Sequence, residues 1–109
     1  MIAAFERPDI FAGFCSQAGF SDPNDYNIRI AEVGLSHRPA SVLIHGEDDP
    51  DVRVRESDEV HLLFEELEWE YGEDWMYERI PNATHEWQSQ YNQKFWEFLF
   101  ERPNPLVQP

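Results

Sequence analysis

Basic residues are scarce in this sequence, which has 8 Lys and Arg against 22 Asp and Glu and a formal net charge of −14. Such a charge repels the phosphates of nucleic acids and anionic membrane surfaces, so we expect neither as a partner. The chain has a single cysteine, Cys15, which excludes an internal disulfide. Its apolar runs are too short for a transmembrane helix, and residues 1–11 lack the basic start and apolar core of a signal peptide. Together these absences favour a cytoplasmic location.

The motifs of several kinds of catalytic site are also absent. No Gly-x-Ser-x-Gly sequence is present to form the sharp turn that carries a nucleophilic serine. The four histidines are scattered, and Asp48-Asp49-Pro50-Asp51 offers too few correctly spaced oxygens for a calcium loop. We therefore expect no metal and no cofactor. Cys15 lies in an apolar run, where a free cysteine behaves as a small hydrophobic residue, so we expect it to pack in a buried strand rather than act as a nucleophile.

Apolar and aromatic residues make up 41% and 15% of the 109 residues, enough for one small folded domain. We place this domain at residues 1–101 and a Pro-rich, extended tail at residues 102–109. Strand and helix patterns alternate along the domain, which predicts an α/β fold with a partial parallel sheet of about three strands and flanking helices. The predicted strands are residues 10–18, 40–45 and 74–80, and the predicted helices are residues 1–6, 55–71 and 89–101. Residues 19–39 are predicted to form a long loop with one helical turn near residues 28–33.

Periodicity indicates which faces of these elements are buried. Residues 40–45 form a nearly continuous apolar run, which is typical of a strand covered on both faces. In the helix expected at residues 55–71, apolar residues recur at spacings of three and four, and Gly72 is placed as the helix stop. Nine carboxylates lie between Glu56 and Asp74; a solvated helix face explains them, and a patch for a basic partner is the alternative. In the third strand, Trp75, Tyr77 and Arg79 are expected on one face, with Met76, Glu78 and Ile80 on the other.

One titratable side chain follows each of the last two predicted strands. Asp49 lies in the acidic turn after the second strand, and His85 lies in the turn after the third. The carboxyl ends of neighbouring parallel strands meet at one edge of a sheet, so both side chains are expected on the same rim. A carboxylate that orients an imidazole is the acid–base arrangement of a serine-type hydrolase. Asp48 and Asp51 compete with Asp49 for this role, and Trp87 is placed to contact a substrate or to pack beside the site.

Each of these residues also has a plainer interpretation. Asp49 is equally a turn carboxylate near the start of the next helix, and His85 an ordinary loop histidine. We expect His45 to pack or to hydrogen-bond at the end of its strand. His37 and His61 are expected on the surface.

Four segments carry a family resemblance that covers nearly the whole chain. Residues 42–52 (VLIHGEDDPDV) match a strand, His-Gly turn and acid loop, and residues 81–87 (PNATHEW) match a histidine turn. Residues 6–13 (ERPDIFAG) match the stretch in which the chain leaves the helix that follows the nucleophile and enters the next strand. Residues 91–99 (YNQKFWEFL) match the closing helix, the last helix of the domain. In this order they resemble the C-terminal portion of an α/β-hydrolase, most closely the esterase, polyhydroxybutyrate-depolymerase-like and prolyl-oligopeptidase-like branches.

The resemblance implies the C-terminal half of an α/β-hydrolase fold, with Asp49 as the acid and His85 as the base of a catalytic triad. It implies hydrolysis of a carboxylic ester by acyl transfer to water, with peptide hydrolysis as the second choice. The substrate would be a small-molecule ester or a peptide, and no cofactor is needed. The nucleophilic serine and the oxyanion-hole loop are expected outside this chain, so we expect the chain to be inactive alone.

Two classes of function stay open at this point. One is the acid–base half of a hydrolase, which an N-terminal hydrolase half would complete. The other is an acidic, non-catalytic interaction module on a hydrolase-derived scaffold. In both cases an exposed sheet edge is expected, through which the chain would bind the missing half or associate with itself.

Overall fold

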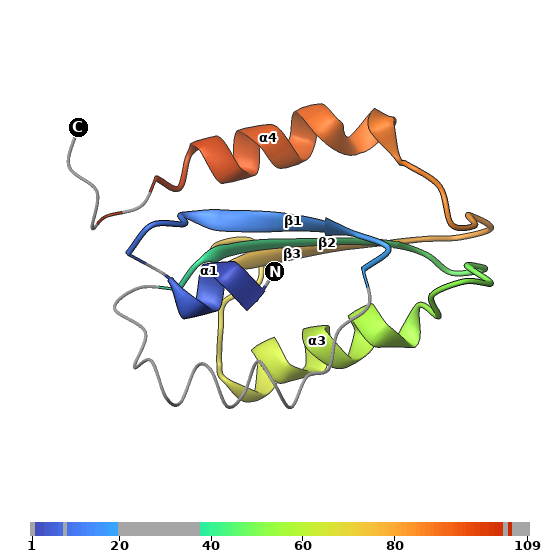
Figure 1. Ribbon diagram of the computed structural model, residues 1–109, viewed down its shortest axis with the longest axis horizontal. Helices are drawn as coiled ribbons and strands as arrows, with labels where there is room; N and C mark the ends of the chain where they lie inside the picture. The colour runs from blue at the N-terminus through green and yellow to red at the C-terminus, as the bar shows by residue number, and fades with distance from the viewer. Residues whose placement is uncertain (1, 8, 20–37, 104, 106–109) are drawn as a thin grey trace.

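A three-stranded parallel sheet forms the centre of the molecule in the computed structural model, which describes residues 2–7, 9–19, 38–103 and 105 (Figure 1). The strands are β1 (Gly13–Gln17), β2 (Ala40–Gly46) and β3 (Trp75–Ile80), in the order β1-β2-β3. The helices are α1 (Ile2–Glu6), α3 (Arg55–Glu66), a 3₁₀ turn at Ser89–Tyr91, and α4 (Asn92–Phe100). Figure 1 shows α4 above the sheet and α1 and α3 below it. The predicted α/β class, with three parallel strands and flanking helices, is therefore confirmed.

Strand β2 is the central strand, and all of its residues are buried, as its apolar run predicts. It pairs in parallel with β1 from Gly13↔Ala40 onward and with β3 from Ser41↔Trp75 onward. Parallel strands with helices on both faces are shielded from water on both sides, which explains the apolar run. The same pairing brings the carboxyl ends of β2 and β3 together at one rim.

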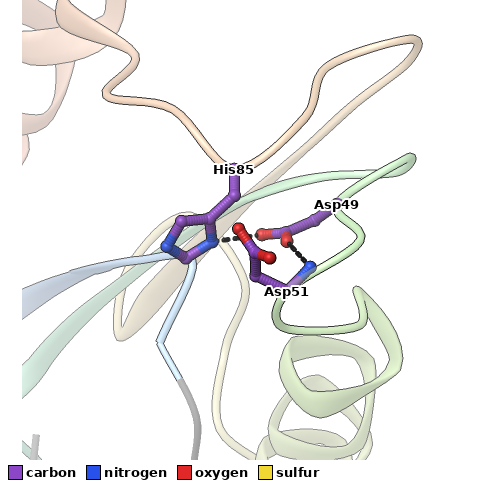
Figure 2. Close-up of side chains that lie close together, drawn as sticks. All are labelled: Asp49, Asp51 and His85. Carbon is purple, nitrogen blue, oxygen red and sulfur yellow. Dashed lines mark hydrogen bonds and ion pairs between the residues drawn. The ribbon is translucent and has the colours of Figure 1, made fainter.

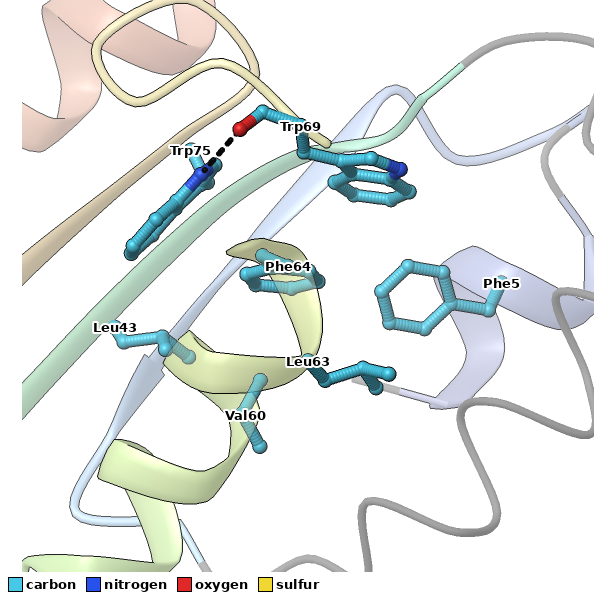
Figure 3. Close-up of a cluster of buried hydrophobic side chains, with 7 residues drawn as sticks. All are labelled: Phe5, Leu43, Val60, Leu63, Phe64, Trp69 and Trp75. Carbon is cyan, nitrogen blue, oxygen red and sulfur yellow. Dashed lines mark hydrogen bonds between the residues drawn. The ribbon is translucent and has the colours of Figure 1, made fainter. Parts of the chain in front are cut away.

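The lower face of the sheet packs on an aromatic core (Figure 3). The rings of Phe64 and Trp69 are stacked, with centroids 4.8 Å apart and an interplanar angle of 7°. The indole N–H of Trp75 donates to the Trp69 carbonyl at 3.4 Å. Fully burying a side chain such as Phe64 contributes about 1.5–3 kcal/mol. The buried members of this core are Phe5, Leu43, Val60, Leu63, Phe64, Trp69 and Trp75.

A second core lies between the upper face and α4, where Val42 and Ile44 of β2 meet Phe95 and Phe98. Strand β3 divides its side chains between the two cores as its alternation predicts. Trp75 and Tyr77 pack against the lower core, and Met76 and Ile80 pack against the upper core. The two charged residues of β3 follow the same rule, since Arg79 pairs with Asp58 of α3 and Glu78 pairs with Lys94 of α4.

Helix α3 ends at Glu66, not at Tyr71 as its periodicity predicts. Glu68 then adopts a positive φ of 60°, and the Trp69 N–H donates to the Phe64 carbonyl at 3.0 Å. In a continuous helix, residues five apart point about 140° away from each other, so Phe64 and Trp69 could not stack. The chain leaves the helix to make that stack, and Gly72, the predicted stop, has its positive φ of 88° in the following turn.

Strand β1 is also shorter than predicted, because the N–H groups of Ile10 and Phe11 bond to the Arg7 carbonyl in a turn. The helical turn predicted near residues 28–33 lies outside the described residues. Arg102, the first residue of the expected tail, donates to the carbonyls of Gly72, Glu73 and Phe98 and is anchored to the domain. Among the helices that the structure describes, none combines the length and apolar character needed to cross a membrane.

Candidate catalytic acid–base site

The loops that follow β2 and β3 are bonded directly to each other. The Glu47 N–H donates to the Ile80 carbonyl at 2.9 Å, and the Asp48 N–H donates to the Ala83 carbonyl at 3.0 Å. Gly46 permits this approach, since a Cβ atom there would lie 2.4 Å from the Ala83 carbonyl oxygen. A glycine at the end of β2 therefore sets the distance between the acid loop and the histidine loop.

The structure brings Asp49 and His85 into contact, as their rim positions predict (Figure 2). His85 Nδ1 lies 2.7 Å from Asp49 Oδ2, across 36 residues of sequence. The Asp49 side chain is completely shielded from solvent. Its other oxygen, Oδ1, accepts the N–H groups of Asp51 at 2.8 Å and Val52 at 2.9 Å. These three hydrogen bonds hold the carboxylate in one orientation toward the imidazole.

The Asp49 carboxylate is kept ionised by its hydrogen bonds. Burial opposes its ionisation, but the N–H groups of Val52 and Asp51 and the ring of His85 outweigh that cost and hold its pKa below the usual range. An ionised carboxylate only accepts hydrogen bonds, so the proton between the two residues belongs to Nδ1 of His85. The tautomer of the imidazole is thereby defined.

His85 presents its second nitrogen away from the aspartates (Figure 2). Its side chain is 41% exposed, in contrast to the buried Asp49. The hydrogen bond to Asp49, and the charges of Asp49 and Asp51, raise the pKa of His85 above its ordinary value. With Nδ1 donating to Asp49, the neutral ring carries a free electron pair on Nε2, the atom that a general base requires.

A second histidine, His45, connects the acid loop to the sheet and to α3 by hydrogen bonds. It is buried at the end of β2, with Nδ1 2.8 Å from the Ser57 hydroxyl and Nε2 2.6 Å from the Val52 carbonyl. A carbonyl only accepts, so Nε2 carries the proton and Nδ1 accepts from Ser57. The prediction that His45 hydrogen-bonds at its strand end is confirmed. Sequence reasoning did not identify its partners, since these lie on the acid loop and on α3.

The two competing aspartates occupy different positions from Asp49. Asp48 is exposed and Asp51 is exposed, while Asp49 alone among the three is buried against the imidazole. Ligand atoms of Asp49, Asp51 and His85 lie within 4.8 Å of one another, close enough to consider a metal ion. However, a metal on Nδ1 would require His85 to lose its proton and its bond to Asp49. The observed hydrogen bonding favours an acid–base pair over a metal site.

Trp87 is placed beside His85 and is 68% exposed. Together with Gln17, Ala18, His85 and Glu86 it lines a shallow pocket of about 170 Å³. The pocket lies where the end of β1 meets the histidine loop, and the Gln88 N–H ties the two by donating to Gln17 Oε1 at 3.1 Å. A substrate that reaches His85 through this pocket would contact the Trp87 ring.

One prediction about a titratable side chain is wrong. Cys15 is exposed, because β1 is an outer strand rather than a central one. Partial desolvation nevertheless raises the pKa of its thiol to about 11, so it is protonated and a poor nucleophile. His61 lies at the surface as expected, with 32% of its side chain exposed, and its ring also packs against Trp75 with centroids 4.9 Å apart. His37 lies outside the described residues.

Comparison with models of protein families and with curated proteins gives no match to this chain. The sequence motifs and the geometry of the Asp49–His85 pair are therefore the evidence for its function.

Proposed function

We propose that this chain supplies the acid and the base of a serine-type hydrolase that cleaves carboxylic esters by acyl transfer to water. One observation carries the proposal: a buried, ionised carboxylate orients a half-exposed imidazole whose other nitrogen is free. The Asp49–His85 distance of 2.7 Å is within the range of a strong, charge-assisted hydrogen bond. A solvated loop histidine would need no buried partner of this kind.

In the proposed reaction His85 acts as the general base and Asp49 as the residue that orients it. Nε2 of His85 accepts the proton of a serine hydroxyl while the serine oxygen attacks the ester carbonyl. The imidazolium that forms is stabilised by Asp49 and then donates the proton to the departing alcohol. In the second half of the cycle, Nε2 accepts a proton from water as the water oxygen attacks the acyl-enzyme. The imidazolium then returns this proton to the serine oxygen, the acyl–oxygen bond breaks and the carboxylic acid is released.

The nucleophile in this scheme comes from outside the described residues. Among the residues that the structure describes, no serine or cysteine hydrogen-bonds to His85, whose partner is Asp49. Ser57 already donates to His45, and Ser41 donates to the Pro39 carbonyl. A serine presented by another polypeptide segment would complete the site. The sequence order of acid before base supports the C-terminal half of an α/β-hydrolase fold as the scaffold.

Ester hydrolysis is favoured over peptide hydrolysis by the esterase-like closing helix, which corresponds to α4. Peptide hydrolysis uses the same acid and base, so the Asp49–His85 pair supports both reactions. Parallel assays with an ester and with a peptide p-nitroanilide distinguish them.

The proposal is tested by complementation. The nucleophile-bearing half of an α/β-hydrolase esterase, produced without its own acid and base segments, is co-expressed with this chain. The co-purified complex is expected to hydrolyse p-nitrophenyl butyrate. His85→Gln and Asp49→Asn are each expected to lower the rate by about 10⁴-fold. Asp48→Asn is the matched control, because Asp48 is an exposed carboxylate of the same loop, and it should leave the rate unchanged.

A complex that co-purifies but stays inactive would contradict the proposal. Activity that survives His85→Gln would do the same, because it would show that another group acts as the base.

A further inference from the structure

The two outer strands of the sheet differ in how their edges are protected. Strand β3 carries Glu78 and Arg79, which form ion pairs with neighbouring side chains. Strand β1 has the sequence GFCSQ and carries no charge. Proteins commonly guard an edge strand with charged residues, because its unpaired backbone groups attract other strands. Strand β1 has one strand neighbour among the described residues, β2, and its other edge has no such guard.

The backbone of β1 offers a regular set of hydrogen-bonding groups at this edge. The Ala12 carbonyl and the Ala18 N–H both bond to residues of the β2 segment. Backbone groups of successive residues in a strand point to alternate sides. Gly13, Cys15 and Gln17 therefore turn their N–H and C=O groups toward the free edge. Cys15 is the middle one of these three residues.

A groove without charge adjoins this edge. It has a volume of about 420 Å³ and is lined by side chains of β1, of α4 and of the loop before α4, all of them apolar or neutral. In this chain 28% of the residues are charged. The uncharged groove adjoins the uncharged edge of β1, so the two form one continuous surface without charge. The lining residues are Cys15, Gln17, Trp87, Asn92, Gln93, Phe95, Trp96 and Leu99.

Large aromatic rings are exposed around the groove. Trp87 is 68%, Trp96 is 64% and Phe100 is 73% exposed. Burying three such rings would remove on the order of 400 Å² of surface per copy, about half of what one partner contributes to a standard interface. Pairing of the strand backbones and closure of the groove would add to this area.

We propose that a second copy of this chain occupies the edge, with the two β1 strands pairing antiparallel about a two-fold axis at Cys15. In this register Gly13 of one copy faces Gln17 of the other, and Cys15 faces Cys15. An axis perpendicular to the sheet keeps both α4 helices on the same face, so the two grooves close against each other. The sheet becomes continuous across six strands, three from each copy.

Charge and symmetry favour a second copy over an unrelated strand. Each copy carries a net charge of −14, and copies of the same chain repel each other wherever acidic surfaces meet. The β1 edge and its groove present no charge, so this face can meet its own copy without close like-charge contacts. A two-fold pairing is also self-complementary and closed, since each copy uses its β1 edge once. The remaining long-range repulsion is screened by physiological salt.

The dimer requires neither Asp49 nor His85. It does use the β1 edge through which a missing hydrolase half would bind, and it covers Trp87, so the dimer and the completed hydrolase are alternative assemblies of this chain. The test is the mass of the native chain in solution across the micromolar range, measured by sedimentation equilibrium. We expect a concentration-dependent dimer. Cys15→Ser should remain dimeric, whereas Cys15→Lys, which places two like charges opposite each other, should be monomeric. Cys15 is exposed, so both variants are expected to fold, and circular dichroism checks this.

Two further measurements locate the interface. In the proposed register the two Cys15 Cα atoms lie about 5.5 Å apart. Cys15 is the sole cysteine, so a short bis-maleimide should yield a covalent dimer from folded protein and none from denatured protein. Trp96→Gln should weaken the dimer at least about tenfold. Leu62→Gln is the matched control, since Leu62 is a 53% exposed apolar residue on α3 at the opposite face.

A folded native chain that stays monomeric throughout this range would overturn the proposal. So would a dimer that Cys15→Lys and Trp96→Gln leave unchanged, since that dimer would use another surface. A monomer that instead binds an added hydrolase half through this edge would assign the edge to that partner. The ester assay described above is read separately, so failure of the dimer and failure of the hydrolase proposal are distinguishable.

Discussion

His45 Nε2 lies 3.3 Å from Asp49 Oδ2, and both side chains are completely shielded from solvent. His45 is bonded on both ring nitrogens, to Ser57 of α3 and to the Val52 carbonyl of the acid loop. The loop that holds Asp49 is therefore tied to the end of β2 and to the start of α3 through a single buried ring. This ring holds the structure of the acid loop, whereas in the proposed reaction it is His85 that faces the reacting group.

His45→Ala is expected to lower the free energy of unfolding by about 2–4 kcal/mol. The substitution leaves the Val52 carbonyl without its buried donor and opens a cavity at the end of β2. Ser57→Ala removes only one of the hydrogen bonds of His45, so its cost should be smaller, about 1 kcal/mol. Urea unfolding of the three proteins measures the difference. Equal stability of His45→Ala and the native chain would show that the ring does not hold the loop.

Gly46→Ala is expected to separate the acid loop from the histidine loop. Its Cβ would lie 2.4 Å from the Ala83 carbonyl oxygen and 2.7 Å from that of Thr84, both of them backbone atoms that cannot rotate away. We expect lower stability together with a weakened Asp49–His85 hydrogen bond, seen as a fall in the pKa of His85 by NMR. Gly72→Ala is the contrasting variant: its Cβ would meet nothing within 4 Å, although its positive φ still costs stability. An unchanged His85 titration in Gly46→Ala would refute the spacing role of the glycine.

Asp49→Asn is expected to lower the pKa of His85 toward its ordinary value. In the native chain that pKa is raised first by the hydrogen bond to Asp49 and further by the charges of Asp49 and Asp51. Asparagine removes the hydrogen-bonded charge and leaves only the more distant one. Histidine ring NMR signals followed against pH give the comparison, with Asp51→Asn expected to produce a smaller shift. A larger effect of Asp51→Asn would show that Asp51, and not Asp49, is the residue that orients His85.

The Asp49–His85 pair is expected to stabilise the fold within a defined pH window. The pKa of His85 is raised in the folded chain, so its contribution is complete below its unfolded value of about 6.5 and is lost as pH rises through the folded value. The pKa of Asp49 is lowered, so its contribution is present above about 3.9 and is lost as pH falls through the folded value. Unfolding midpoints of the native chain and of His85→Gln should differ most between these limits. A constant difference at all pH values would argue against the pair.

The chain alone is expected to hydrolyse p-nitrophenyl esters no faster than buffer. A base and its orienting carboxylate do not replace a nucleophile, and the serine supplies the covalent step. The assay is run with the purified native chain and with His85→Ala. Turnover by the native chain that disappears in His85→Ala would show that this chain already carries a working nucleophile.

The rim position of Asp49 and His85 could be predicted because it depends on two local patterns. Strand periodicity locates the ends of β2 and β3, and a helix between two neighbouring strands is the crossover connection that parallel strands require. The burial of Asp49 and the bond to His85 could not be read from the same patterns. Asp48, Asp49 and Asp51 are chemically alike, and only the contact between the two loops distinguishes them.

The errors for Cys15 and for the end of α3 have a related cause. A short apolar strand has the same sequence signature at the centre of a sheet as at its edge, so the sequence pattern predicts a buried Cys15. Apolar spacing continued past Glu66, but the stack of Phe64 on Trp69 competes with the helix and ends it. Both outcomes depend on which surfaces pack together. The periodicity of apolar residues indicates only which side chains of a segment are buried, not what they pack against.

The order of strands and helices, the parallel α/β arrangement and the loops that contain Asp49 and His85 can all be read from the sequence alone. Those features follow from backbone geometry and from the spacing of apolar residues along one segment. Packing between segments sets which aspartate meets His85, what His45 holds in place and, among the described residues, which strands lie at the edges of the sheet. These depend on contacts between segments far apart in the chain, whose energies arise only when the layers pack.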